Sequence, residues 1–258
     1  MDKLVFITGA SSGIGQALAW RYHQAGWRLA LSARRGALIE DWARQQGIAG
    51  ERYRIYEADV ADRLAIVAAG QDCLSMQGVP DTVIANAGIS IGMETAARED
   101  LEVMARVFST NNVGMAATFH PFVAAMAQRR SGRLAGIASV AGIRGLPGHG
   151  AYCASKAAVI SYCESLRGEL RGTGVRVVTI CPGYIDTPLT RKNRYPMPFL
   201  MAAPAFADRA FAAIEAGASY RVIPWQMAVV ARLLRLLPDA VFDRALAGQP
   251  RKGRGRPD

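Results

Sequence analysis

Short apolar runs alternate with longer stretches of helical pattern in the first part of the chain, up to about residue 188. The runs are almost continuously apolar, which is typical of strands buried on both faces of a sheet. The predicted strands are Leu4–Thr8, Arg28–Ser32, Tyr53–Ala58, Asp81–Ala85, Arg133–Ile137 and Val175–Ile180. The predicted helices are Ala17–Ala25, Leu38–Gln46, Asp62–Met76, one long helix over Glu99–Phe108 and Met115–Gln128, and Tyr152–Leu170.

The alternation of strand and helix, at a spacing of roughly 25–35 residues, is the pattern of parallel βαβ units. The chain has 258 residues, of which 51% are hydrophobic, and this suffices for a packed core. No linker-like stretch divides the alternating part. We therefore predict a single α/β domain over residues 1–250, built around a doubly wound parallel sheet.

The pattern changes in the last quarter of the chain. Residues 188–204 contain four prolines, which predicts an irregular segment. Helical patterns follow at Ala205–Ala216 and Trp225–Leu237, so residues 221–247 are expected to form a C-terminal helical region. Residues 251–258 read RKGRGRPD, a basic and glycine-rich sequence that predicts a disordered tail.

A glycine-rich turn, TGASSGIG at residues 8–15, joins the first predicted strand to the first predicted helix. Glycine permits a sharp backbone turn and a close approach to a phosphate. The helix that follows directs free N–H groups and the positive end of its dipole toward the same point. The turn therefore predicts a phosphate site, with a tight turn that binds no ligand as the alternative.

This turn resembles the cofactor loop of the short-chain dehydrogenase/reductase superfamily, classical type, whose members have a Rossmann fold. Further motifs of that family follow in the expected order and cover about residues 3–190. They are Asp59-Val60, Asn86-Ala87-Gly88, Asn111-x-x-Gly114, Ser139, Tyr152-x-x-x-Lys156, and Pro182-Gly183 with Thr187. A lone Y-x-x-x-K is common by chance, whereas this whole series at the ends of successive strands is not.

The resemblance implies a nicotinamide dinucleotide cofactor. In the family, the asparagine-alanine-glycine motif supports the sheet and passes beside the adenine ribose, and the acidic residue after the third strand meets the adenine amino group. The cofactor-binding residues that the resemblance implies are Gly9, Ser11, Ser12, Gly13, Ile14, Gly15, Arg34, Arg35, Asp59, Val60, Asn86, Ala87, Gly88, Tyr152, Lys156, Pro182, Gly183, Ile185 and Thr187.

Tyr152 and Lys156 lie four residues apart and share a helix face. A nearby ammonium favours the phenolate, so we expect Lys156 to lower the pKa of Tyr152 and to make it a general acid and base. The resemblance implies that Ser139 holds the substrate oxygen and that Asn111 holds a water in a proton relay. Asn111 is preferred to Asn112 because a glycine follows three residues later. Taken singly, each of these side chains is equally explained as a packing, capping or surface residue.

The second predicted strand ends at Ala33 and is followed by Arg34 and Arg35. Relatives specific for NAD carry an acidic residue here that binds the adenosine 2′-hydroxyl. A small residue followed by arginine instead admits a 2′-phosphate and pairs with it. We therefore expect a preference for NADP(H), with NAD(H) as a possible second cofactor. Two solvated loop charges are the alternative, and Ser12 lacks the basic side chain that some NADP-preferring relatives have at that position.

Segments that flank the motifs are expected to hold the substrate. In the family, specificity comes from the part of the chain here numbered about 189–220, which we expect to be a lid, and residues 142–150 are expected to form the opposite wall. The lid is rich in apolar and methionine side chains, which suits an apolar substrate but equally suits ordinary packing. Its large apolar residues are Tyr195, Met197, Phe199, Leu200, Met201 and Phe206.

These expectations combine into an NADP(H)-dependent oxidoreductase that interconverts a ketone or aldehyde with an alcohol. The alternative is a dinucleotide-binding redox sensor without turnover, which the presence of Tyr152 and Lys156 disfavours. The four cysteines form no C-x-x-C pair and only three histidines occur, so no metal site is expected. The cysteine pattern and an N-terminal apolar run too short for a signal peptide indicate a cytoplasmic protein.

The net charge of +10 raises the question of anionic partners. The basic residues are scattered and no nucleic-acid-binding motif occurs, so we expect no nucleic acid partner. The predicted helix Trp225–Leu237 is apolar on one face and carries arginines elsewhere, so it is expected to pack on its own domain or on a second subunit, with peripheral membrane contact as a disfavoured alternative. That face consists of Trp225, Val229, Leu233, Leu236 and Leu237. The resemblance implies a homo-oligomer, joined through the helices that carry Asn111 and Tyr152.

Overall fold

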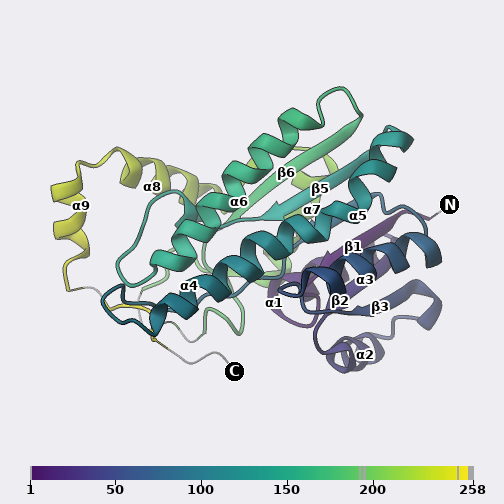
Figure 1. Cartoon of the computed structure of the whole chain (residues 1–258), viewed down its shortest axis with the longest axis horizontal. Helices are drawn as coiled ribbons and strands as arrows, with labels where there is room; N and C mark the ends of the chain where they lie inside the picture. The colour runs from purple at the N-terminus through teal and green to yellow at the C-terminus, as the bar shows by residue number, and fades with distance from the viewer. Residues whose placement is uncertain (1, 192, 194–195, 249, 255–258) are drawn as a thin grey trace.

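The apolar runs form the strands of one parallel sheet in the computed structural model, which describes residues 2–191, 193, 196–248 and 250–254. Every strand of this seven-stranded sheet is parallel to its neighbours, in the order β3-β2-β1-β4-β5-β6-β9 (Figure 1). The strands are β1 Leu4–Thr8, β2 Arg28–Ala33, β3 Tyr53–Glu57, β4 Thr82–Ala85, β5 Gly132–Ile137, β6 Val175–Pro182 and β9 Tyr220–Ile223. The strand order reverses between β1 and β4, and ligands of doubly wound folds bind at such a switch point.

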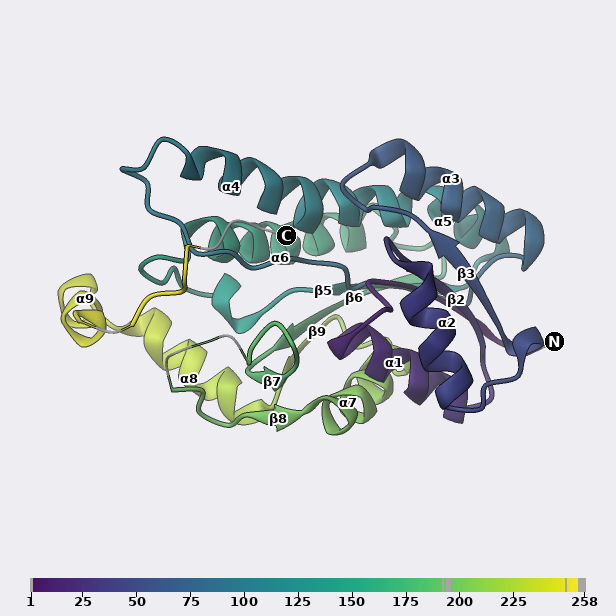
Figure 2. The same ribbon diagram turned by 90° about the horizontal axis from the view of Figure 1, so that it is seen from below.

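Helices cover both faces of the sheet, which confirms the predicted fold class (Figure 2). One face is covered by α3 Arg63–Met76, α4 Asp100–Phe108, α5 Gly114–Arg129 and α6 Gly150–Glu169. The other face is covered by α1 Gly13–Gln24, α2 Gly36–Gln45 and α7 Ala203–Glu215, while α8 Trp225–Leu236 and α9 Asp239–Leu246 extend from one end. Two separate apolar layers result, one centred on Phe119 and Phe122 and the other on Leu18 and Tyr22.

Two short strands lie in the part of the chain that was predicted to be irregular or helical, and a third lies just before it. Tyr220–Ile223 adds β9 to the central sheet, so the region predicted as helical from residue 221 begins inside a strand. β7 Ile185–Asp186 and β8 Met201–Ala202 pair as a separate two-stranded sheet. A strand of two residues cannot show a period in the sequence, and β9 has only two buried residues because Tyr220 and Arg221 are exposed. The predictions for residues 201–202 and 221–223 were wrong for these reasons.

The predicted long helix is present but contains a wider, π-helical turn at Ser109–Val113 between α4 and α5. Such turns are often found at functional sites. This turn holds Asn111, which is 2% exposed. Gly114 follows it at a point where a Cβ atom would lie 2.6 Å from the carbonyl oxygen of Val60, so the helix presses directly on the loop after β3.

The C-terminal segment returns to the start of α4 (Figure 2). Arg254 donates hydrogen bonds to Asp100 at 2.8 Å and to Glu99 at 3.0 Å, and the Gly92 amide donates to the carbonyl oxygen of Gly253 at 3.3 Å. Residues 251–254 therefore follow a defined course, in contrast to the disorder expected for 251–258. Residues 255–258 lie outside the described part of the chain.

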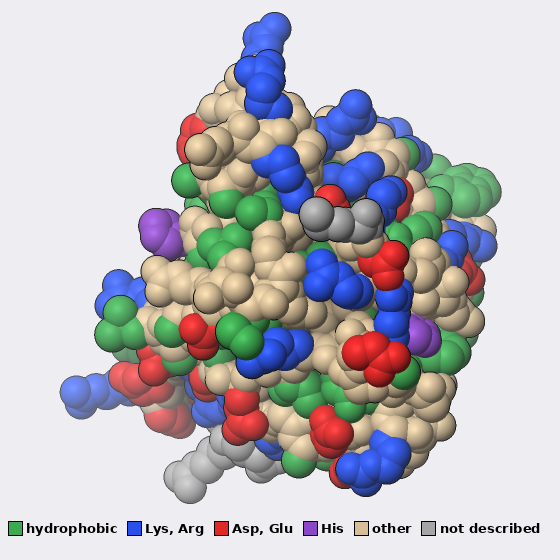
Figure 3. Space-filling model, turned by 90° about the vertical axis from the view of Figure 1, so that its right-hand side faces the viewer, with side chains coloured by type: hydrophobic (Ala, Val, Ile, Leu, Met, Phe, Trp, Pro, Cys, Tyr) green, Lys and Arg blue, Asp and Glu red, His purple; other side chains and the backbone are tan. Residues whose placement is uncertain are grey.

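Basic side chains do not gather into a single stripe on the face shown in Figure 3, where acidic groups lie among them. This agrees with the scattered placement of Lys and Arg along the sequence. Among the helices that the structure describes, none has the length and apolar character needed to cross a bilayer.

Candidate active site

The glycine-rich turn links the end of β1 to the start of α1 at the switch point of the sheet. Gly9 and Gly13 have φ angles of +68° and +56°, a region that side chains with a Cβ atom rarely adopt. At Gly15 a Cβ atom would lie 2.2 Å from the carbonyl oxygen of Gly9. The chain needs glycine at all three positions to bring the N-terminus of α1 this close to the turn, where that end of the helix favours an anion.

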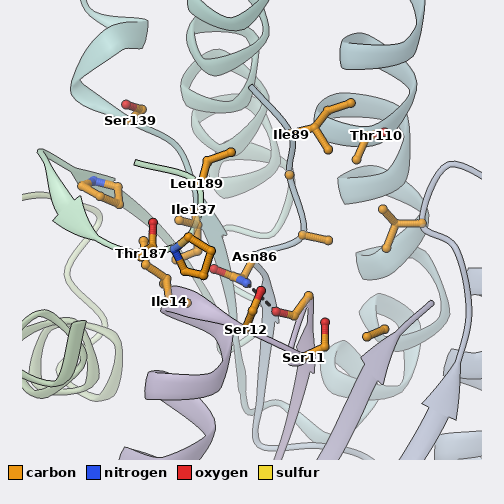
Figure 4. Close-up of a pocket in the computed structure, with 18 of the residues that line it drawn as sticks. Ser11, Ser12, Ile14, Asn86, Ile89, Thr110, Ile137, Ser139, Thr187 and Leu189 are labelled. Carbon is orange, nitrogen blue, oxygen red and sulfur yellow. Dashed lines mark hydrogen bonds between the residues drawn. The ribbon is translucent and has the colours of Figure 1, made fainter. Parts of the chain in front are cut away.

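A cavity of about 320 Å³ runs along the carboxyl ends of the strands in front of this turn. In Figure 4, Ser11 and Ser12 lie toward one end of the cavity and Ser139 lies toward the other. Of the residues predicted to bind the cofactor, all but Gly15 line this cavity, and Gly15 packs behind the turn. The lining also includes Leu189 and Thr190 from the predicted lid, and residues that the sequence analysis did not name, among them Ala61, Ile89, Arg106 and Thr110.

Asn86 joins the glycine-rich turn to the end of β4. Its side-chain amide donates to the carbonyl oxygen of Thr8 at 3.0 Å and of Gly9 at 3.4 Å. In return, the Thr8 hydroxyl accepts from the amides of Asn86 and Ala87, both at 3.2 Å. These bonds hold the two central strand ends together and leave the backbone of residues 86–88 along the cavity wall.

Arg34 and Arg35 follow β2 at the edge of the same cavity. The Arg34 guanidinium lies 3.8 Å from the carboxylate of Asp59, and both side chains are about half exposed. An ion pair this open to water contributes little, so Arg34 can exchange it for another anion. A second carboxylate nearby, that of Glu57 at the end of β3, accepts from the amide of Gly36 at 3.2 Å, at the start of α2.

Ser139 and Tyr152 meet at the far end of the cavity. Ser139 follows β5, and its hydroxyl accepts from the Ala141 amide at 3.1 Å, which caps a short helical turn. Tyr152 lies in the first turn of α6. Burial raises the pKa of Tyr152 to about 12, and its hydrogen bond with Ser139 offsets this only in part. The prediction that Lys156 lowers this pKa is therefore wrong.

The environment of Lys156 explains why the pKa of Tyr152 is raised and not lowered. Its ammonium donates to the carbonyl oxygen of Ile137 at 2.8 Å and lies 5.8 Å from the centre of the Tyr152 ring. The side chain is 5% exposed, and burial lowers the pKa of Lys156 to about 8. Loss of water thus disfavours the charged forms of both groups, and the attraction between them does not overcome this.

Asn111 lies behind the cavity wall rather than on it. Its amide group donates to the carbonyl oxygen of Ile89 at 3.0 Å and to the Ser155 hydroxyl at 2.9 Å, while its oxygen accepts from the Ile89 amide at 2.8 Å. A Cβ atom at Gly88 would lie 3.1 Å from that oxygen and 3.4 Å from the Lys156 ammonium. Asn111 therefore fixes the loop after β4 next to Lys156.

A second cavity, of about 260 Å³, shares Ser139, Tyr152 and Gly183 with the first. The predicted opposite wall is present, with Ile143, Arg144, Leu146 and His149 in the lining. The lid is divided. Leu189, Thr190, Asn193 and Pro198 line this cavity, whereas Phe199 and Leu200 are exposed, Phe206 is in the core, and Tyr195 lies outside the described residues.

The sequence analysis did not anticipate the wall that α8, the last residue of α9 and the C-terminal segment add to the second cavity. Its residues are Met227, Val230, Ala231, Leu234, Leu246 and Lys252. Gly183 contacts this wall directly, since a Cβ atom there would lie 2.7 Å from the Met227 side chain. That contact joins positions 44 residues apart in the chain (227 − 183), which no local pattern reveals.

Comparisons with known proteins agree with this geometry. The model of the short chain dehydrogenase family matches residues 3–197. An uncharacterized oxidoreductase of Myxococcus xanthus is 38% identical over 243 residues, which cover 94% of this chain and 96% of that protein. The structure of ElxO with NADP bound has a TM-score of 0.79 at 21% identity and covers 86% of this chain and 97% of that one.

A 3-oxoacyl-[acyl-carrier protein] reductase of Brucella melitensis, solved with NAD, has a TM-score of 0.75 at 27% identity and covers 86% of this chain and 89% of that one. The family match covers most of the sequence, including the glycine-rich turn and the tyrosine and lysine at the junction of the cavities. This chain belongs to the short chain dehydrogenase family of oxidoreductases.

Proposed function

We propose that the protein is an NADP(H)-dependent oxidoreductase that interconverts a ketone or aldehyde with an alcohol, with Tyr152 as its general acid and base. One observation carries this proposal: Ser139 and Tyr152 belong to the lining of both cavities. A cofactor in the first cavity and a substrate in the second would therefore meet at a hydroxyl and a phenol. The apolar lining that α8 contributes supports an apolar body for the substrate.

The first cavity suits a dinucleotide. Gly9, Gly13 and Gly88 leave room where a side chain would collide with backbone or side-chain atoms, and the start of α1 favours a phosphate group. Arg34 and Arg35 stand at the opposite edge, where a 2′-phosphate would be paired. The nicotinamide supplies or accepts the hydride when it is bound.

The residues of the chain then account for the proton. Ser139 and Tyr152 hydrogen-bond the substrate oxygen and hold it in place. In the direction of reduction, the neutral phenol of Tyr152 donates its proton to that oxygen as the carbon accepts the hydride. In the direction of oxidation, the phenolate takes the proton back, and the buried ammonium of Lys156 stabilises that negative charge. Asn111, next to Lys156 across Gly88, supports a route for protons to solvent.

Replacing Tyr152 with Phe tests this role. We expect NADPH-dependent reduction of ketones and aldehydes to fall by about 10²–10⁴-fold, because positioned proton transfer contributes that much. NADPH should still bind, since the glycine-rich turn and arginines are unchanged, and fluorescence titration of NADPH measures this. Tyr220→Phe, at a partly exposed position in β9, is the matched control. Full activity of Tyr152→Phe would show that another group transfers the proton.

The cofactor preference is tested at Arg34, because solved relatives of this fold contain NADP in one case and NAD in another. We expect Arg34→Ala to weaken NADPH binding by about tenfold to a hundredfold, the value of a charge-assisted hydrogen bond, and to leave NADH binding nearly unchanged. Arg54→Ala, an exposed position in β3, is the control. Equal weakening of both cofactors would contradict the proposed contact with the 2′-phosphate.

A further inference from the structure

A buried serine lies between Tyr152 and Lys156 on α6. Ser155 follows Tyr152 by three residues and directly precedes Lys156, and it is 0% exposed. The described linings of the two cavities do not include Ser155, so it is not placed to contact a cofactor or substrate bound there. The sequence analysis did not name this residue. Any effect of Ser155 on the reaction must therefore act through the residues that it contacts.

The hydrogen bonds of the Ser155 hydroxyl have only one possible direction. Its oxygen lies 2.8 Å from the carbonyl oxygen of Tyr152, and a carbonyl group has no proton to give, so the hydroxyl donates here. A hydroxyl has a single proton, and this bond uses it. Toward the side chain of Asn111, whose nitrogen is 2.9 Å away, Ser155 can therefore only accept.

The backbone of Ile89 makes the complementary demand on Asn111. The Ile89 amide donates to the Asn111 oxygen at 2.8 Å, and the Ile89 carbonyl oxygen accepts from the Asn111 nitrogen at 3.0 Å. Both N–H groups of the side chain are thus used, one by Ile89 and one by Ser155. The Asn111 oxygen lies beside Gly88, where a Cβ atom would be 3.1 Å from this oxygen and 3.4 Å from the Lys156 ammonium. The negative end of the amide dipole is therefore on the side of Lys156.

The wide turn at Ser109–Val113 holds Ser155 a second time. The side-chain amide of Asn112 donates to the Ser155 carbonyl oxygen at 2.8 Å, while Asn111 bonds the hydroxyl of the same residue. Two neighbouring residues of the turn thus hold one residue of α6, one through its side chain and the other through its main chain. Removing the hydroxyl leaves the bond from Asn112 in place, so it tests the link to Asn111 and not the whole contact between the turn and α6.

We propose that Ser155 is a positioning residue of the active site, which holds the Asn111 side chain with its oxygen toward Lys156 and ties it to the main chain of Tyr152. An amide dipole in this orientation stabilises the nearby ammonium. The ammonium in turn stabilises the phenolate that Tyr152 becomes when it gives up its proton. This inference rests on the proposed function and adds a residue that acts through Asn111.

Replacing Ser155 with Ala tests the hydroxyl, with acetophenone as the ketone and NADPH as the cofactor. We expect kcat to fall by about tenfold to a hundredfold, because a buried N–H of Asn111 loses its acceptor. KM and the NADPH dissociation constant should stay within about twofold of the wild-type values, since both cavity linings are unchanged. The matched control is Thr118→Val, which removes a buried hydroxyl bonded to the carbonyl oxygen of Gly114 at 2.7 Å on α5 and should keep the wild-type kcat.

A double-mutant cycle separates this role from a general loss of packing. If Ser155 acts through Asn111, adding Ser155→Ala to Asn111→Ala should lower kcat no further, whereas independent effects would multiply. Effects that multiply, or full activity of Ser155→Ala, would overturn the inference and leave the proposed reaction intact. A rise in KM equal to the fall in kcat would also overturn it, because that result places Ser155 in substrate binding.

The orientation of Asn111 is also measured without turnover, by NMR. The side-chain amide signals of Asn111, identified by their absence in Asn111→Ala, should move in Ser155→Ala and stay in place in Thr118→Val. Signals that stay in place in Ser155→Ala would overturn the inference whatever the activity. If the wild-type protein reduces no ketone but these signals depend on Ser155, the proposed function fails and the positioning of Asn111 by Ser155 stands.

Discussion

At the scale of single residues, burial and function oppose one another at Lys156. In the proposed reaction the ammonium stabilises a phenolate, yet the same burial that brings it beside Tyr152 removes it from water. Its pKa is lowered to about 8 from an ordinary value of 10.5. A group whose pKa falls on folding in this way destabilises the folded state wherever it is protonated, and one pKa unit corresponds to about 1.4 kcal/mol.

Replacing Lys156 with Met should therefore stabilise the protein at neutral pH while it abolishes activity. We expect a gain of about 2–3 kcal/mol in the free energy of unfolding at pH 7. This gain is smaller than the full cost of burying the charge, because the variant also loses the hydrogen bond to Ile137. The gain is complete below the folded pKa of about 8 and disappears as the pH rises toward 10.5. Urea unfolding at pH 7 and at about pH 9.5 measures it, with Lys3→Met at an exposed position as control. Destabilisation at both pH values would mean that the bond to Ile137 outweighs the burial.

At the scale of elements, the sequence predicts the features that depend on neighbouring residues and misses those that depend on contacts between distant residues. Six strands of the central sheet are apolar runs and were predicted, whereas β9 has four residues, two of them exposed, and was not. Motifs at strand ends led to residues that line the first cavity, because parallel strands bring their carboxyl ends to one edge. The wall formed by α8 and Lys252 depends on long-range contacts. The bond of Arg254 to Asp100, for example, spans 154 residues.

The C-terminal segment is an element of this long-range kind, and its anchor is testable. Asp100 is 5% exposed, and its pKa is lowered by the hydrogen bond from the Glu94 amide and then by Arg254. Arg254→Gln should raise the rate of amide exchange at residues 90–94 and 250–254 by about threefold to tenfold, because the ion pairs with Glu94, Glu99 and the buried Asp100 are lost. Hydrogen exchange with mass spectrometry measures this, and Arg191→Gln, which breaks the exposed pair with Asp186, is the control.

Lowering the pH should loosen the C-terminal segment as Arg254→Gln does, because the bond of Arg254 to Asp100 needs an ionised carboxylate. Because the pKa of Asp100 is lowered on folding, its contribution is present above the ordinary value of 3.8 and is lost as the pH falls through the lower folded value. Exchange at residues 90–94 should therefore accelerate below about pH 4, relative to the intrinsic rate at each pH. No change in Arg254→Gln at neutral pH would show that the backbone contact of Gly92 with residues 252–253 suffices to hold the segment.

At the scale of the whole molecule, the apolar face predicted on the helix after residue 225 is turned outward. Trp225, Val229, Leu233 and Leu236 are 66%, 47%, 59% and 80% exposed. The helix packs on the domain with its other side, through residues such as Met227 and Ala231. Packing on its own domain therefore does not explain the four exposed residues, and a second subunit or a membrane is left to cover them. Contiguous exposed apolar residues of this kind commonly mark an interaction surface.

Charge distinguishes these two partners. The helices α8 and α9 contain three arginines and two aspartates, a net charge of +1 (3 − 2), which is small for binding to an anionic membrane surface. We therefore expect a second copy of the chain to cover the four exposed apolar residues of α8. The double change Leu233→Glu and Leu236→Glu should shift the protein to a smaller species in sedimentation velocity, because charges at a contact between copies oppose association. Leu101→Glu on α4 tests in parallel the interface implied by the family resemblance. If the wild-type protein sediments as a monomer and floats with anionic vesicles, a membrane covers these four apolar residues instead.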